Sequence, residues 1–150
     1  MAVKVVQFLA VVLTALALSP GVANGLALSR KLHLPQERYY VVQAIYRGWD
    51  LFPIVLVAAL AANLNQAIMA AGEGLPFHLA VAATILAGAA LAIFLAVTLP
   101  TDLATDNWKS VTPDWQKLRA RWEYSHAANA LLLLCALGAV TLSILSGAAP

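Results

Sequence analysis

The sequence contains few charged residues for its length. Only 11% of its 150 residues are Asp, Glu, Lys or Arg, against roughly a quarter in soluble domains. Hydrophobic residues make up 62% of the chain, and the mean hydropathy is +0.81. A small soluble fold cannot bury so many apolar side chains, whereas a bundle of helices in lipid faces them outward. We therefore expect an integral membrane protein of the bacterial inner (plasma) membrane, with the lipid bilayer as its main partner.

Cysteine and the common nucleotide-binding motifs are also scarce or missing. One cysteine, Cys135, excludes an intrachain disulfide and a multi-cysteine metal site. The net charge of +2 is too small to indicate a nucleic-acid partner. The sequence has no phosphate-binding glycine loop, no Gly-x-Ser-x-Gly turn and no dinucleotide fingerprint. We therefore expect no nucleic-acid binding and no function driven by a nucleotide.

Four apolar segments predict an all-α fold, an integral membrane four-helix bundle formed by a single domain over residues 1–150. The expected helices span about 3–30, 35–70, 77–99 and 113–146. Each contains enough apolar residues to cross roughly 30 Å of hydrocarbon. Prolines are expected to bend the first helix at Pro20 and the second at Pro53. The first segment also resembles a cleaved signal peptide, which remains the alternative to a retained helix.

The basic residues predict the orientation of the bundle. Eight of the nine belong to the first and third connections or to the helix starts that follow them: Arg30, Lys31, Arg38, Arg47, Lys109, Lys117, Arg119 and Arg121. The second connection and the C-terminus contain neither Lys nor Arg, and Lys4 is the exception. By the positive-inside rule, the basic end is cytoplasmic and both termini are non-cytoplasmic.

Two polar stripes are expected at this cytoplasmic end. On the last helix, spacings of three, four and seven place on one face Trp115, Arg119, Trp122, Glu123 and His126. The stripe on the second helix comprises Gln36, Tyr39, Tyr40, Gln43, Tyr46, Arg47 and Asp50. Ionisable residues at membrane depth are costly unless they pair or face a wet cavity, so the stripes predict an inward-facing site. The alternative is a set of simple ion pairs, Arg47 with Asp50 and Arg119 with Glu123, within an aromatic belt that includes Trp49.

The same residues also allow a metal hypothesis. The spacing of Glu123 and His126 matches half of a carboxylate-bridged two-metal site, but the second helix offers Asp50 without a histidine. A haem held by two histidines lacks its second ligand, because His78 is expected on the far side and His33 in a connection. We therefore predict no metal and no cofactor.

A series of residues has the order seen in a known family. It comprises Leu34-Pro35, Tyr39, Gln43, Tyr46, Gly48-Trp49, Asn107-Trp108, Trp115, Leu118-Arg119, Arg121-Trp122-Glu123 and His126. In this order the chain resembles, over nearly its whole length, the anthrone-oxygenase-like family of small four-helix membrane proteins. The most specific part is the run from Trp115 to His126. Family members often carry a basic residue shortly after the histidine, and this chain has Ala128, Asn129 and Ala130 there.

The resemblance implies that oxygen is inserted into an activated aromatic carbon, converting an anthrone to a quinone without an established organic cofactor. His126 would be the base that Glu123 orients, and aromatic rings would stack on the substrate. Arg47 or Arg119 would stabilise the phenolate. We therefore predict His126 and Glu123 as catalytic residues, and as substrate-binding residues Gln43, Tyr46, Arg47, Trp49, Asp50, Asn107, Arg119 and Trp122. The alternative is a non-catalytic accessory or assembly subunit, whose stripe would face a partner membrane subunit or a second copy of the chain.

Overall fold

Four long helical segments form the body of the protein. The computed structural model describes residues 1–46, 48 and 52–147, and these residues include no β-strand. The long segments are α1 (Ala2–Leu32), α3 (Phe52–Met69), α4 (Leu75–Ile93) with its continuation to Ala104, and α6 (Trp115–Gly147). Each is long and apolar enough to cross a membrane. The prediction of an all-helical chain with four such segments is confirmed.

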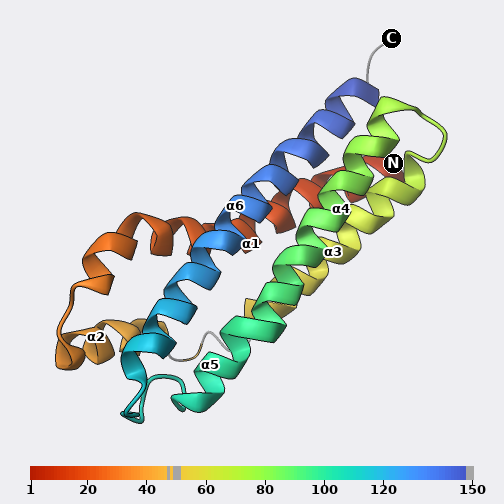
Figure 1. Ribbon diagram of the computed structural model, residues 1–150. Helices are drawn as coiled ribbons and strands as arrows, with labels where there is room; N and C mark the ends of the chain where they lie inside the picture. The colour runs from red at the N-terminus through yellow and green to blue at the C-terminus, as the bar shows by residue number, and fades with distance from the viewer. Residues whose placement is uncertain (47, 49–51, 148–150) are drawn as a thin grey trace.

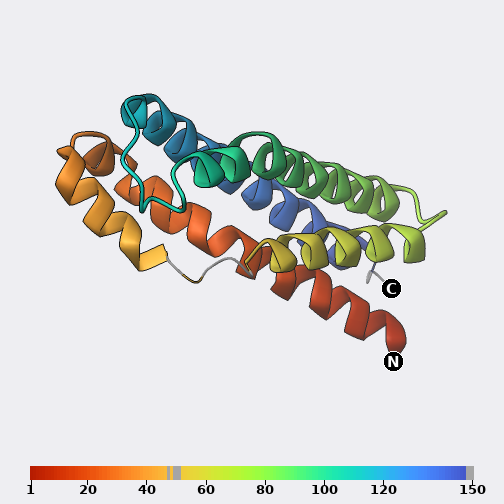
Figure 2. The same cartoon turned by 90° about the horizontal axis from the view of Figure 1, so that it is seen from below.

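The long helices pack as a closed ring (Figure 1). α1 contacts α3 and α6, and α4 contacts the same two helices. The start of α1, the end of α6 and the turn between α3 and α4 lie at one end of the bundle, called here the terminal end (Figure 2). The short helix α2 (Gln36–Gln43) and the connection between α5 (Leu99–Ala104) and α6 lie at the other end, called here the α2 end. The two stretches that carry the predicted polar stripes therefore share one end of the molecule.

Small residues allow the helices to approach closely. Gly21 lies against α6, where an added Cβ would come within 3.0 Å of the Ala130 Cβ. The buried face of α4 consists of Pro76, Ala80, Ala83, Ala87 and Ala90. Close backbone packing stabilises helix contacts in lipid, where no hydrophobic force drives helices together. Large apolar side chains instead lie on the outside, as expected for a lipid-facing surface: examples are Phe8, Leu26, Ile85 and Leu131.

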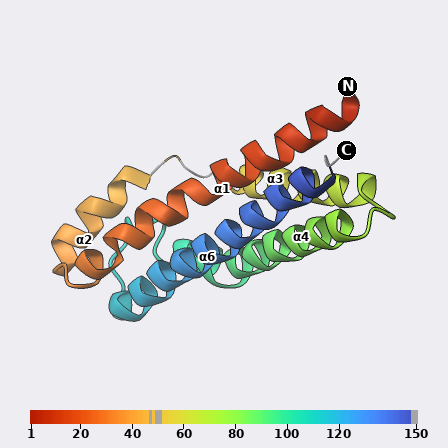
Figure 3. The same ribbon diagram turned by 90° about the horizontal axis from the view of Figure 1, so that it is seen from above.

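The prediction of one helix over residues 35–70 is wrong. α2 ends at Gln43 and continues into a single 3-10 turn, η1 (Ala44–Tyr46), while α3 begins only at Phe52. Gly48 has a φ of +90°, which a right-handed helix does not allow. Pro53 lies in the first turn of α3, where its missing N–H leaves no hydrogen bond unmade. The residue expected to bend a helix instead lies at a helix start, and the chain reverses after α1 so that α2 runs back from the end of α1 (Figure 3).

The third segment extends past its predicted end at residue 99. After α4 the chain forms a π-helical turn, η3 (Phe94–Thr98), and then α5. Pro100 lies in the first turn of α5. Proline removes an i to i−4 hydrogen bond, and the wider turn directly before it accommodates that loss. This continuation carries the segment to the α2 end of the bundle.

Candidate functional site

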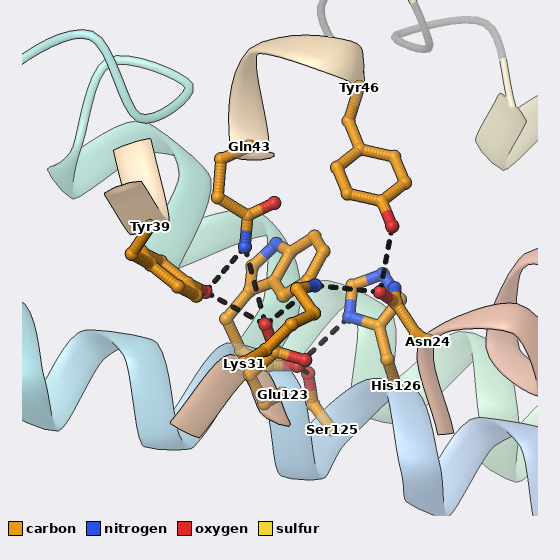
Figure 4. Close-up of polar contacts among 9 residues, drawn as sticks. Asn24, Lys31, Tyr39, Gln43, Tyr46, Glu123, Ser125 and His126 are labelled. Carbon is orange, nitrogen blue, oxygen red and sulfur yellow. Dashed lines mark hydrogen bonds and ion pairs between the residues drawn. The ribbon is translucent and has the colours of Figure 1, made fainter. Parts of the chain in front are cut away.

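The two polar stripes meet at the α2 end. The Tyr39 hydroxyl donates to Glu123 Oε1 at 3.0 Å (Figure 4). Gln43 Nε2 donates to the Tyr39 hydroxyl and, at 3.4 Å, to Glu123 Oε1. Tyr39, Gln43 and Glu123 are all buried. At these three positions the stripes do face inward, as their spacing predicts.

The ionic partner of Glu123 is Lys31, at the end of α1. Lys31 Nζ lies 2.7 Å from Glu123 Oε1, and the two residues are 4% and 1% exposed. The ammonium also donates to Asn24 Oδ1 at 2.8 Å and lies 4.7 Å from the centre of the Trp122 ring. A buried ion pair overcomes its desolvation cost only when further hydrogen bonds satisfy both ions. Asn24 supplies such a bond to Lys31 and Tyr39 supplies one to Glu123 Oε1, while Glu123 Oε2 has no partner among the described residues. The pair joins α1, α2 and α6 in one network.

The ion pair between Arg119 and Glu123, part of the alternative interpretation of the stripes, does not form. Arg119 Nη1 donates instead to the Leu34 carbonyl at 2.8 Å, and the guanidinium lies 4.7 Å from the centre of the Trp115 ring. The long side chain reaches the connection between α1 and α2, while Lys31 takes the carboxylate. Arg119 therefore holds this connection in place.

The proposed pair of Arg47 and Asp50 lies outside the described residues, as does Trp49.

A cavity of about 300 Å³ lies beside this network. Apolar residues from several helices form much of its wall, including Ala17, Leu56, Phe94 and Leu133. Its polar and aromatic wall residues include Asn24, Gln43, Tyr46, Asn107, Trp108, Trp122, His126 and Asn129. Small-molecule pockets typically have roughly 300–1,000 Å³, with apolar walls and a few polar groups. The cavity has both the size and the chemistry of such a pocket.

The predicted site residues divide into two groups around this cavity. Those in its wall are Gln43, Tyr46, Asn107, Trp122 and His126. Glu123 and Arg119 are not among the wall residues. Glu123 affects the wall indirectly, because it accepts a hydrogen bond from Gln43 and so positions the Gln43 side chain, which lines the cavity.

His126 is held by the backbone of its own helix. Its Nδ1 lies 2.9 Å from the Trp122 carbonyl oxygen, and its ring centre lies 3.9 Å from that of Trp122. A carbonyl only accepts, so this bond places the proton on Nδ1 and leaves Nε2 of the neutral ring as an acceptor. The prediction that Glu123 orients His126 is wrong, because the Glu123 carboxylate turns toward Lys31. The backbone orients the imidazole instead.

Two tyrosines of the site act as hydrogen-bond donors. Burial raises the pKa of Tyr39 far above its ordinary value, and the charge of Glu123 raises it further. The same two causes, in the same order, raise the pKa of Tyr46. The Tyr46 hydroxyl donates to Asn24 Oδ1 at 3.0 Å. Both phenols therefore remain protonated at neutral pH.

The sequence interpretation missed Lys31 and Asn24 as members of the site. A signal for them exists in α1, whose buried residues recur at spacings of three, four and seven: Ala10, Thr14, Ala17, Gly21, Asn24 and Lys31. Such spacing marks a single inward face. An amide and an ammonium on the face that otherwise carries small residues indicate an interior partner. Trp108 was missed as a site residue because it lies in a connection, where no periodicity applies.

A metal site has no support in the part of the chain that the structure describes. No three His, Cys, Asp or Glu side chains there lie close enough to hold an ion. The second half of the two-metal hypothesis depends on Asp50, which is outside that part.

Comparisons with protein-family models, curated proteins and solved structures gave no match.

Proposed function

We propose that the protein binds a flat, lipophilic aromatic or quinone-like molecule in the cavity at the α2 end, as a small membrane protein of the anthrone-oxygenase-like type. The observation that carries this proposal is the cavity itself. Its wall brings together Tyr46, Trp108, Trp122 and His126 in an otherwise largely apolar pocket. Aromatic side chains offer a large apolar surface and stack on flat rings. A lipophilic ligand would also partition into the surrounding bilayer.

His126 is the candidate base for an oxidation of this ligand. Its Nε2 would remove a proton from a ring carbon made acidic by flanking aromatic rings and a carbonyl. The resulting carbanion would reduce O₂, forming a C–O bond and a peroxide anion, which the imidazolium would protonate to a hydroperoxide. Loss of the second proton from the same carbon, with cleavage of the O–O bond and release of water, would leave a ketone. The balance is CH₂ + O₂ → C=O + H₂O, so oxygen is the oxidant and no organic cofactor is needed.

We also propose that the α2 end faces the cytoplasm of a bacterial inner membrane. Basic residues support this orientation, because the α2 end carries Arg30, Arg38, Lys109, Lys117 and Arg121. At the terminal end, Lys4 is the only Lys or Arg among the described residues. The positive-inside rule favours the cytoplasm for the more basic end. Both termini would then be non-cytoplasmic.

Burial of the stripes supports a cavity over an accessory role. Tyr39, Gln43, Trp122 and Glu123 are buried inside the single chain. An assembly subunit would need such residues on its surface to contact a partner. The outer surface remains available for a second copy or a partner membrane subunit, but the polar site is already enclosed.

Native mass spectrometry tests the proposal on protein purified gently from its own membranes, with an absorbance spectrum and metal analysis. We expect an aromatic or quinone-like molecule at near-unit occupancy. The Leu99→Trp variant should lose it, because Leu99 lines the cavity. Leu95→Trp is the matched control, since Leu95 lies four residues earlier, is 53% exposed and is not among the wall residues. An empty protein held in fixed stoichiometry by a partner would contradict the proposal and favour the accessory role.

The catalytic part has its own test. The His126→Ala variant should keep the bound molecule and lose oxygen-dependent turnover, because it removes the base but leaves most of the wall. Full turnover by this variant would show that His126 is not the base.

A further inference from the structure

The cavity extends along the helices of the bundle. On α6 its wall residues follow one another at spacings of four, three and four: Trp122, His126, Asn129 and Leu133. Such spacings keep side chains on one face of a helix, so α6 borders the cavity over about three turns. The rise from Trp122 to Leu133 is about 16 Å, at roughly 1.5 Å per residue. The cavity is therefore elongated parallel to α6.

The inner end of the cavity, the end nearer the middle of the bundle, is almost entirely aliphatic. Each of the four long segments contributes a wall residue there: Ala17, Leu56, Phe94 and Leu133. Ala17, Leu56 and Leu133 belong to one buried apolar cluster, and Phe94 packs against it. Because these four side chains have no polar atoms, they offer a ligand apolar contacts only.

The outer end of the cavity, the end nearer α2, is aromatic and polar. Trp108 and Trp122 belong to a second buried cluster, against which Tyr46 packs. All three line the cavity, and the Tyr46 hydroxyl donates to another wall residue, Asn24. The wall therefore changes along α6 from aromatic and polar at Trp122 to aliphatic at Leu133.

In a membrane the two ends lie at different depths. Arg121 is exposed on α6, and the sequence has no Asp, Glu, Lys or Arg after Glu123. An exposed arginine at the end of an apolar span lies at the headgroup level, because its charge is costly in hydrocarbon. Leu133 lies about 18 Å further along at roughly 1.5 Å per residue, near the middle of a hydrocarbon layer roughly 30 Å thick. The cavity therefore runs from the headgroup level towards the bilayer centre, as lipid chains do.

We infer that the ligand carries an aliphatic chain, with its polar ring at the outer end of the cavity and its chain between Leu56 and Leu133 at the inner end. The inference rests on the proposed function and extends it to an amphiphile, since a flat three-ring molecule is shorter than the distance from Trp122 to Leu133. A chain needs no hydrogen-bond partner, and contacts with the aliphatic wall replace its contacts with lipid chains. In the cavity such a ligand keeps the orientation that an amphiphile has in the bilayer, with its polar part at the headgroups.

Photolabelling of the wild-type protein tests where the chain lies. The probe is a naphthoquinone with a decyl chain that ends in a diazirine, irradiated with the full-length protein in detergent. Peptide mass spectrometry should find the label on residues of the inner end, such as Leu56, Phe94 or Leu133, and an excess of decylnaphthoquinone should displace it. Displaceable label at the outer end only, or on exposed residues such as Leu134, would overturn the inference.

A pair of variants gives a second measurement. Leu133→Trp places an indole at the inner end and should weaken equilibrium binding of decylnaphthoquinone about tenfold, because a filled site tolerates little added volume. Binding of naphthoquinone without a chain should stay unchanged, since the ring lies at the outer end. Leu134→Trp is the matched control, because Leu134 is 54% exposed and does not line the cavity, and it should change neither affinity. A folded Leu133→Trp protein that binds decylnaphthoquinone as tightly as wild type would contradict the inference.

The outcomes separate the inference from the proposed function. If wild-type protein binds neither naphthoquinone, the proposed function fails and the inference fails with it. If wild-type protein binds naphthoquinone without a chain but shows no displaceable label at the inner end, the cavity binds a ring and the inferred chain is wrong. The label is measured on wild-type protein, so it decides even where Leu133→Trp does not fold.

Discussion

The two ends of the bundle differ in the kind of contact that their buried polar groups make. At the terminal end the contacts join neutral groups: Asn63 Nδ2 donates to Thr14 Oγ1 at 2.8 Å, and Ser143 Oγ donates to the Pro76 carbonyl at 2.7 Å. An apolar cluster of Ala10, Ala83 and Val140 lies at this end. At the α2 end a charged pair, tyrosines and tryptophans surround a cavity. The difference indicates that the terminal end mainly packs helices together, while the α2 end carries the site.

The largest effect should come from breaking the charged pair. Lys31→Met should lower the free energy of unfolding by about 3–5 kcal/mol, because it leaves the Glu123 carboxylate buried without its cation. The double variant Lys31→Met/Glu123→Leu should lower the free energy of unfolding by clearly less than the sum of the losses in the two single variants. Denaturant titration in detergent, with circular dichroism as the signal, measures all three. Additive costs would mean that the two side chains do not depend on each other, and the contrast between the two ends would weaken.

A smaller effect is expected at the tyrosine that donates to the same carboxylate. Tyr39→Phe should lower the free energy of unfolding by roughly 1.5–3 kcal/mol, the range for hydrogen bonds to charged groups. Tyr40→Phe is the matched control on the same helix, because its hydroxyl donates to the exposed Ser110 carbonyl at 3.3 Å. In the same titration, Tyr40→Phe should lower the free energy of unfolding by much less than Tyr39→Phe does. Equal costs would argue that the Glu123 network contributes no special stability.

The smallest effect should come from the terminal end. Ser143→Ala removes a neutral hydrogen bond, and comparable bonds between membrane helices contribute about 0.6 kcal/mol. Ser146→Ala is the control, since the Ser146 hydroxyl donates only within its own helix, to the carbonyls of Leu142 and Ser143. The Ser146→Ala variant should leave the melting temperature almost unchanged. If Ser143→Ala destabilised the protein as much as Lys31→Met, both ends would depend equally on polar contacts.

Much of the site followed from local pattern, but its internal partners did not. Helical spacing placed Trp122, Glu123 and His126 on one face of α6, and all three are buried or half-buried. The same reasoning offered Arg119 as an alternative partner of Glu123, because residues four apart on a helix are neighbours. In the structure Lys31 approaches from another helix and takes the carboxylate. Local spacing gives the face of a residue and leaves open which residue of a neighbouring helix meets it.

The sequence by itself determined the class of the molecule. Few charges and four long apolar segments require helices, because a chain in lipid must satisfy its backbone hydrogen bonds internally. Only the tertiary structure decided the interruption between α2 and α3, the pairing of Lys31 with Glu123 and the entry of Trp108 into the cavity wall. These features depend on how helices rotate against one another and how a short connection turns. These features are stabilised by contacts between segments far apart in the sequence. A pattern within one segment does not determine such contacts.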